Sequence, residues 1–376
     1  MHSIVRDFRV DQAMRYSVFV PRLYNLCRSF GFKAGQMMPS RAFCSDESQG
    51  FPIILITKHF GAFPFNHGRA GGIVATGRHG PHAHHGEDMV IIQASHVGYD
   101  PVSESFGSYC RLQTTDQTMS TTCGKVGMVL SWYLEEYAFA QQNVFLGREG
   151  EHVTVTLDNQ LLDDRREEGL ILDLRKLLKM ENGAPVLLRT QSTSRVFIAS
   201  ENLDTYMPDV VWPVEGKRVA IGQHLMSELF SFRRAIHAGN EDVDVLENNL
   251  IHSMPWIVRA KSPILMAAQV NSQAEFDRTY RSIIKEKAYR GKRLLFISCL
   301  NIDISPKPGQ LFPLTKCVPW AAYVQQSDGD SKIYEQAALM QLLNEQSSEN
   351  PDQIDLEEAI QQMIDAPGIT VANGGG

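Results

Sequence analysis

The run MVIIQASHVG at residues 89–98 constrains the fold of this chain more than any other sequence feature does. It begins with consecutive apolar residues, and polar residues and a glycine close it. A short apolar run that ends in this way is typical of a strand buried inside a sheet. Such a strand needs cover, so the run favours an α/β protein in which helices pack on the sheet.

Other segments have the composition of strands or helices, and the two kinds alternate along the chain. The predicted strands are 152–158, 185–191, 195–200 and 292–304, and the predicted helices are 120–142, 161–180 and 221–236. Residues 1 to about 50 are expected to be helical, with breaks near Gly31, Gly35 and Pro39. This alternation favours a mainly parallel sheet flanked by helices.

The composition excludes several classes of protein. Of the 376 residues, 43% are hydrophobic and 21% are charged, which is ordinary for a globular protein with a sizeable core. The net charge of -7 leaves no basic excess, so we expect no nucleic-acid partner. No apolar run is long enough for a membrane span, and the charged start MHSIVRDFRV lacks the apolar core of a signal peptide. We therefore expect a cytoplasmic protein.

The chain divides by composition into two parts. Residues 1–325 are expected to form one α/β domain, and residues 326–376 an acidic, partly helical C-terminal extension. Within the extension, 352–368 has the pattern of a short amphipathic helix that Asp355 caps. An isolated helix of this length is marginal, so we expect its apolar face to dock on the body or on a partner subunit. That face carries Leu356, Ile360, Met363 and Ile364.

Cysteine and histidine side chains stand where the predicted elements meet. His96 ends the predicted strand, and in open parallel sheets reactive groups gather at the carboxyl ends of strands. Cys123 stands before or within the first turn of the next predicted helix, where free N–H groups favour the metal-binding thiolate. Cys44 precedes both, in RAFCSDE. Because a lone buried cysteine is more often a small core residue than a ligand, these positions leave both interpretations open. The remaining cysteines, expected in the core, are Cys27, Cys110, Cys299 and Cys317.

Residues 61–88 are rich in glycine and histidine and are expected to be mostly loop. The glycines lack the GxGxxG spacing and the Walker lysine of a phosphate cradle, so we expect them to let the backbone approach the metal pocket closely. The histidines of this segment either form a second metal site or line a polar loop near the entrance of the metal pocket, where one of them could carry protons. The polar composition of the loop favours the second interpretation. These histidines are His79, His82, His84 and His85.

The stretches GFKAGQMMPSRAFCSDE, FNHGRAGGIVATG, ASHVG and STTCG follow one another between about residues 30 and 125. In this order they resemble the limiting-CO2-inducible protein B/C family, the theta-class carbonic anhydrases. The resemblance implies a fold similar to that of β-type carbonic anhydrases, and a Zn²⁺ ion held by Cys44, His96 and Cys123. It also implies a homodimer, because β-type enzymes build their active sites at dimer interfaces.

The residues after the first cysteine depart from the algal members of this family, in which Arg and Asp follow it directly. Here Cys44 is followed by Ser45, Asp46 and Glu47. Asp46 matches the aspartate in the Cys-x-Asp-x-Arg motif of β-type enzymes, but the arginine of that motif is missing here. We therefore predict that Asp46 orients the reacting water and that Arg41 is its partner. Arg69 and Arg111 are the alternatives.

The function that the resemblance implies is reversible hydration of carbon dioxide to bicarbonate by zinc-bound hydroxide. Three protein ligands leave one position on zinc for water, whose pKa the metal lowers toward about 7. A neighbouring arginine would keep Asp46 ionised and away from the metal. Without it, the carboxylate would take the fourth position, and the chain would be a non-catalytic zinc protein of the same fold, a bicarbonate sensor or assembly partner.

Overall fold

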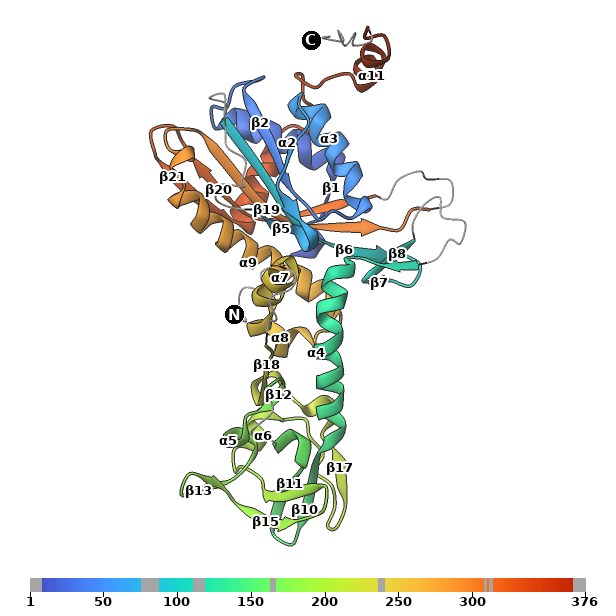
Figure 1. Cartoon of the computed structure of the whole chain (residues 1–376), viewed down its shortest axis with the longest axis vertical. Coiled ribbons are helices and arrows are strands. Elements are labelled where there is room, and N and C mark those ends of the chain that lie inside the picture. The colour runs from blue at the N-terminus through green and yellow to red at the C-terminus, as the bar shows by residue number, and fades with distance from the viewer. Residues whose placement is uncertain are drawn as a thin grey trace, which may run out of the picture.

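The computed structural model describes residues 9–75, 88–110, 119–162, 167–235, 241–307, 310 and 314–367. His79, His82, His84, His85 and Arg111 lie outside these residues, so their predicted roles stay predictions. Figure 1 shows a sheet body at one end, with the long helix α4 (Gly124–Asn143) leading from it to a smaller region at the other end. Among the described residues, no helix combines the length and the apolar composition needed to cross a bilayer.

The sheet of the body has the strand order β1-β20-β19-β6-β2-β3. Strands β19, β6, β2 and β3 run parallel to one another, and β20 closes this parallel core with an antiparallel pairing to β19. The predicted mainly parallel sheet is therefore confirmed. The strands are β1 (Met14–Arg15), β2 (Met37–Ala42), β3 (Phe65–Asn66), β6 (Asp88–Asp100), β19 (Leu294–Ile304), β20 (Lys316–Gln325), and, off this path, β7 (Ser105–Phe106) beside β6 and β21 (Ser331–Glu335) beside β20.

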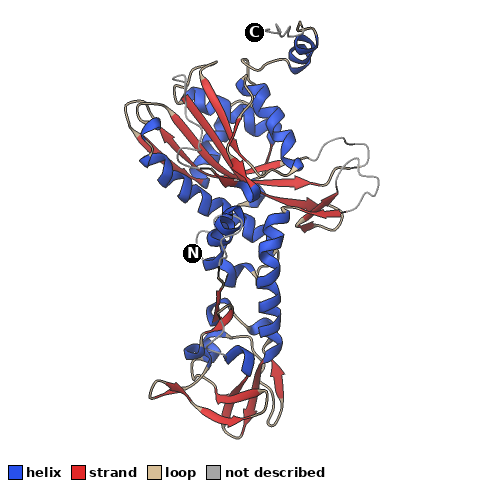
Figure 2. Ribbon diagram, in the orientation of Figure 1, coloured by secondary structure: helices blue, strands red, loops and turns tan. Residues whose placement is uncertain are grey.

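Helices cover both faces of this sheet, as Figure 2 shows. The helices α2 (Tyr16–Ser29), α3 (Gly50–Phe60) and α10 (Gln336–Glu345) share one apolar cluster with Val90 and Ile92 of β6. The helix α9 (Pro263–Lys285) covers the other face, where Phe276 stacks on Phe296 at 5.3 Å between ring centroids. Because neighbouring residues of a strand point to opposite faces, the apolar run at the start of β6 supplies both clusters.

The smaller region, residues 144–235, contains a five-stranded antiparallel sheet of order β15-β16-β11-β10-β17. One apolar cluster joins this sheet to α4 and continues to Cys44 and Cys123 at the edge of the sheet body. The predicted strands 152–158, 185–191 and 195–200 are confirmed. The strands are β10 (Val144–Glu149), β11 (His152–Asp158), β15 (Leu187–Thr190), β16 (Ser194–Ile198) and β17 (Arg218–Ala220), and the helices α7 (Glu241–Leu250) and α8 (Met254–Ile257) follow the region.

The helices predicted at 161–180 and 221–236 are confirmed only in short pieces, α5 (Leu174–Leu177) in the first and the 3₁₀ helices Gly222–His224 and Ser227–Leu229 in the second. The first segment contains strand β12 (Gly169–Leu172), and the second contains strand β18 (Phe230–Arg233), which pairs with β12. In the region of residues 1 to about 50, expected to be helical with breaks near Gly31, Gly35 and Pro39, residues 37–42 form β2 and pair with β6. In each case hydrogen bonding to a distant strand prevails over the local preference of the segment.

The sheet body continues past the predicted boundary at residue 325. Strand β21 pairs with β20, and α10 buries Leu339 and Leu343 against the sheet. Residues 331–345 thus pack on the sheet body, and the division of the chain into a domain and an extension stays a prediction. The helix predicted within 352–368 is confirmed as α11 (Leu356–Ile364), whose first N–H groups donate to the carboxylate of Asp355.

Candidate metal centre

Cys44 lies just beyond the carboxyl end of β2, before the short 3₁₀ helix Glu47–Gln49. Its side chain is buried, and the backbone N–H of Gly71 donates a hydrogen bond to its Sγ atom at 3.1 Å. A hydrogen bond of this kind stabilises negative charge on sulfur. Cys44 is therefore placed to act as a thiolate.

His96 lies within β6, which continues to Asp100, so it does not end the strand as predicted. Its side chain is fully buried, and its Nδ1 atom lies 2.8 Å from Oδ2 of Asp303 on the neighbouring strand β19. The other ring nitrogen, Nε2, is buried and has no hydrogen-bond partner. A buried polar atom without a partner is costly, so Nε2 marks a position at which a ligand is expected.

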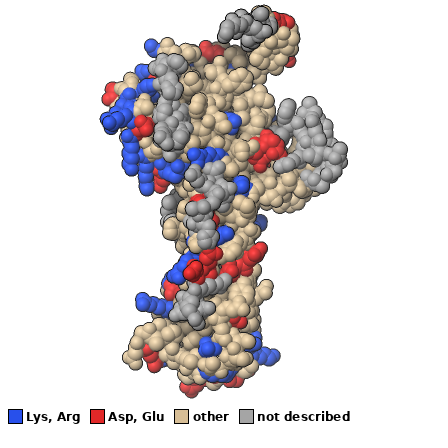
Figure 3. Space-filling model, in the orientation of Figure 1, with Lys and Arg blue, Asp and Glu red and all other residues tan. Residues whose placement is uncertain are grey.

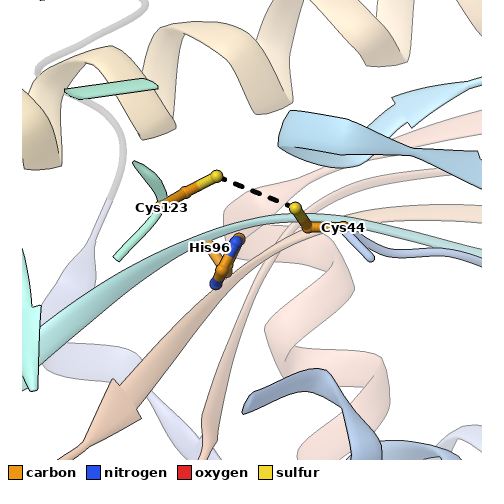
Figure 4. Close-up of side chains that lie close together, drawn as sticks. All are labelled: Cys44, His96 and Cys123. Carbon is orange, nitrogen blue, oxygen red and sulfur yellow. Dashed lines mark hydrogen bonds between the residues drawn. The ribbon is translucent and has the colours of Figure 1, made fainter. Parts of the chain in front are cut away.

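Cys123 is the N-cap residue of α4, which agrees with the predicted place at the start of a helix. Its Sγ atom lies 3.7 Å from that of Cys44 (Figure 4). One ligand atom from each of Cys44, His96 and Cys123 lies within 4.8 Å of the other two, and all three residues are buried. The fold thus brings together three residues that are far apart in sequence.

The donor set of this cluster suits a metal ion. Two thiolates and one imidazole are ligands that zinc accepts in tetrahedral sites, and three protein ligands leave a fourth position free. His96 presents its unpartnered nitrogen while the carboxylate of Asp303 holds the other one. Metal-ligating histidines are held in this way by an outer carboxylate. The cluster of Cys44, His96 and Cys123 could therefore bind a metal ion.

The pKa values of the cluster residues indicate that a bound cation would replace protons. A hydrogen bond from Cys123 lowers the pKa of Cys44 to about 3, and the same contact raises the pKa of Cys123 to about 12. Burial lowers the pKa of His96, but the hydrogen bond with Asp303 and the nearby sulfur atoms of Cys123 and Cys44 outweigh it and raise that pKa well above its ordinary value. Protons thus compensate the negative charge of the cluster, and a metal cation compensates it in their place.

Asp303 is a residue of the site that our sequence analysis missed. Its buried carboxylate accepts hydrogen bonds from Ser48 at 2.8 Å, from Gln49 at 2.9 Å and from Thr315 at 3.1 Å, besides the contact with His96. A carboxylate held on so many sides keeps a fixed orientation. An aspartate near the end of the mostly apolar strand predicted at 292–304 was the signal that could have revealed it.

Glycines bring a neighbouring loop close to the cluster. A Cβ atom on Gly68 would lie 2.1 Å from the carbonyl oxygen of Phe43, and one on Gly72 would lie 2.4 Å from that of Ala94. Gly72 also has a φ of 77°, which residues with side chains rarely adopt. The prediction that these glycines permit close backbone approach is confirmed.

Asp46 and Arg41 do not form an ion pair with each other. The half-buried carboxylate of Asp46 accepts a hydrogen bond from the N–H of Ser48 at 3.3 Å. Burial and a hydrogen bond with Glu47 raise the pKa of Asp46 to about 6, although the charge of His96 opposes this. Arg41 is half-buried, burial lowers its pKa, and its guanidinium group makes no hydrogen bond or ion pair with the described residues. Their partnership stays a prediction.

Comparison with known proteins identifies the fold. The sequence matches no family model and no curated protein. Among solved structures, the chain is similar to PtLCIB4, a homolog of the limiting CO2-inducible protein LCIB, with a TM-score of 0.50 and 11% identity over 89% of this chain and 99% of that one. LCIB itself gives 0.45 and 14% identity over 87% and 95% of the two chains, a likeness too distant to carry weight. The chain thus has the fold of an LCIB homologue, and the predicted family resemblance is confirmed at the level of the fold.

Proposed function

We propose that the protein is a zinc-dependent carbonic anhydrase that interconverts carbon dioxide and bicarbonate. The observation that carries the proposal is the buried cluster of Cys44, Cys123 and the unpartnered Nε2 atom of His96. The likeness to a homolog of a CO2-inducible protein supports it as well. Bound zinc supplies the Lewis acidity that ionises a water molecule near neutral pH.

The residues of the chain have separate parts in this proposal. Cys44, His96 and Cys123 hold the metal, and Asp303 keeps the imidazole oriented so that Nε2 faces the two sulfurs. Asp46, two residues after the first ligand, accepts a hydrogen bond from the reacting water and orients its lone pair toward carbon dioxide. Arg41 keeps the carboxylate of Asp46 ionised and away from the metal.

The direct test is the zinc content of the purified protein together with carbon dioxide hydration followed by stopped flow. We expect about one zinc ion per chain, from the one cluster of three ligands found among the described residues. Hydration that zinc removal abolishes and zinc addition restores would support the enzyme. Protein that holds no zinc after reconstitution under reducing conditions would reject the metal centre and the function together.

Asp303→Asn should weaken zinc binding about 10- to 100-fold, the usual cost of losing an outer partner of a metal-bound histidine. The physical reason is that a neutral amide no longer polarises the imidazole and can donate to Nδ1 instead of accepting from it. Competition with a chromophoric chelator measures the affinity. Thr315→Val is the matched control, because it removes one donor to Asp303 and leaves the contact with His96. Equal affinities of Asp303→Asn and Thr315→Val would contradict this role.

Arg41→Ala should lower the hydration rate about as much as loss of Asp46 does, while the zinc content stays unchanged. The removed guanidinium no longer holds the carboxylate ionised and off the metal. Stopped-flow rates at saturating zinc measure the effect. Arg41→Lys keeps the charge and serves as the matched control. A normal rate for Arg41→Ala would transfer the partnership to Arg69 or Arg111.

The absence of an ion pair between Asp46 and Arg41 favours a second candidate function. In that case the carboxylate of Asp46 takes the fourth metal position, and the chain is a non-catalytic zinc protein, a bicarbonate sensor or an assembly partner. Zinc at full occupancy without measurable hydration would support this alternative. A gain of hydration activity in Asp46→Ala, in which water can take the vacated position, would then identify the carboxylate as the group that closed the site.

A further inference from the structure

A short segment connects the candidate metal ligand Cys44 with helix α9, and we call this segment, residues 70–74, the glycine loop. The N–H of Gly71 donates to the Sγ atom of Cys44 at 3.1 Å, and the carbonyl oxygen of Gly71 accepts a hydrogen bond from Nδ2 of Asn271 at 2.9 Å. Gly71 has a φ of 79°, which glycine adopts without strain. One residue of the loop thus contacts both a metal ligand and α9.

Side chains of the sheet body also hold the next backbone groups of the glycine loop. Nε2 of Gln93, a buried residue of β6, donates to the carbonyl oxygen of Gly72 at 3.2 Å. The N–H of Val74 donates to Oε2 of Glu275 at 2.8 Å, and the guanidinium group of Arg278 donates to the carbonyl oxygen of Val74. The backbone of the loop is therefore fixed at several points along its length.

The two α9 residues nearest to the loop are themselves held in place. Asn271 and Glu275 lie four positions apart and therefore share one face of the helix, and both are 0% exposed. Asn249 of α7 donates to Oδ1 of Asn271 at 2.9 Å and to Oε1 of Glu275 at 2.8 Å. Nδ2 of Asn271 also donates to Oγ of Ser95 at 2.8 Å. Since both ends of its amide have partners, Asn271 has a fixed orientation.

The buried charge of this network needs an explanation. Charged side chains cover parts of the molecular surface, as the space-filling view shows (Figure 3), but the carboxylate of Glu275 lies inside the molecule, where Nε of Arg278 donates to its Oε1 at 2.9 Å. Burial of an ion pair is costly, and apolar side chains often pack the same space at a lower cost. The network is therefore explained better by the orientation that it gives to the glycine loop than by stability.

The orientation of the loop makes the two cysteines of the cluster unequal. Cys44 accepts the N–H of Gly71, whereas no backbone N–H of the described residues donates to the Sγ atom of Cys123. A hydrogen bond to a metal-bound thiolate draws electron density from the sulfur, so it makes that ligand a weaker donor and leaves more positive charge on the cation. Two thiolates otherwise cancel most of the charge of a divalent ion.

We infer that Asn271 is a positioning residue of the metal centre, which acts through Gly71 to keep an N–H donor on Cys44. The inference rests on the proposed metal centre and adds a device that sets the donor strength of one ligand. Asn271 contacts neither the ligands nor the fourth metal position. Its effect reaches the metal through a single backbone residue, whose carbonyl oxygen it holds and whose N–H meets the sulfur.

Loading of the full-length chain with Co²⁺ tests this role, because the absorption band for charge transfer from thiolate to cobalt reports the donor strength of the sulfurs. Asn271→Ala should move this band to lower energy, since a thiolate without its N–H donor gives up an electron more readily. The same variant should bind zinc about tenfold more weakly, the lower end of the cost of losing an outer partner. Ser95→Ala is the matched control, because it removes another partner of the same Nδ2 atom and leaves the contact with Gly71.

A second variant covers the case in which Asn271→Ala does not fold. The double change Asn249→Leu and Asn271→Leu fills the space with apolar side chains and removes both ends of the hydrogen bond between the two amides, which limits the loss of stability. It also removes the contact with Gly71, so it should move the cobalt band in the same direction. Melting temperatures of all variants separate this effect from stability, because a purely structural Asn271 would lower the melting temperature without moving the band.

The outcomes distinguish this inference from the proposed function. A cobalt band that stays in place in a folded variant without Asn271, or one that Ser95→Ala moves equally far, would overturn the inference, while metal uptake by the wild-type chain would still support the metal centre. A wild-type chain that takes up neither Co²⁺ nor Zn²⁺ would overturn both. None of these readouts is hydration of carbon dioxide, so they decide the role of Asn271 separately from activity.

Discussion

Replacement of Cys44 or Cys123 by serine, or of His96 by alanine, is expected to remove most of the zinc from the protein and to abolish hydration of carbon dioxide. Each change deletes one of only three protein ligands in the cluster. Loss of a direct ligand should exceed the cost of about 10- to 100-fold in affinity that loss of an outer partner brings. Elemental analysis after dialysis against a weak chelator measures the retained metal.

Cysteines outside the cluster provide the control for this experiment. Cys110→Ser alters a half-buried cysteine that is not part of the cluster, so it should retain zinc and activity. Circular dichroism of each variant shows whether the fold persists, because the ligands are buried among apolar residues of the core. Full zinc content in all three ligand variants would mean that the metal binds elsewhere.

Removal of the Asp46 carboxylate should leave zinc in place and lower the hydration rate about 10- to 1000-fold, the scale of losing one positioned proton-accepting or orienting group. The structure gives Asp46 another task as well, because it accepts the N–H of Ser48 at the start of the 3₁₀ helix Glu47–Gln49. A loss of activity in Asp46→Ala by itself would therefore combine two effects. Stopped-flow rates and zinc content of two variants separate them.

Asp46→Asn is the variant that distinguishes these tasks. Its amide oxygen still accepts the N–H of Ser48, since asparagine caps helices as well as aspartate does, but the negative charge is gone. If the charge orients the reacting water, Asp46→Asn should be as slow as Asp46→Ala. If only the cap matters, Asp46→Asn should have nearly normal activity. Normal rates in both variants would remove Asp46 from the mechanism.

Much of the fold follows from local patterns. The apolar runs at 89–98 and 292–304 became β6 and β19, and the helix predicted at 120–142 became α4, although it begins later, at Gly124. The sequence pattern also predicted that Asp355 caps the helix that the structure shows as α11. These features depend on residues within a few positions of one another, because burial pattern and capping are short-range properties.

Pairing between strands that are distant in sequence could not be predicted from local patterns. Leu170 pairs with Phe232 in the short sheet of β12 and β18, and neither segment contains the information that the other lies beside it. The strand β2 likewise forms beside β6 rather than as part of a helix. A one-sequence pattern reports what a segment prefers, while the final structure depends on which distant backbone completes its hydrogen bonds.

The sequence by itself determined which residues are able to bind a metal: Cys44, His96 and Cys123 stand in motifs whose order resembles a known family. Only the tertiary structure decided that one ligand atom from each lies within 4.8 Å of the others, and that Asp303 holds His96 from 207 residues away. It also left Asp46 without a paired arginine among the described residues. The reason is physical, because ligand type belongs to the side chain, whereas distance, orientation and solvation arise only when separate strands pack together.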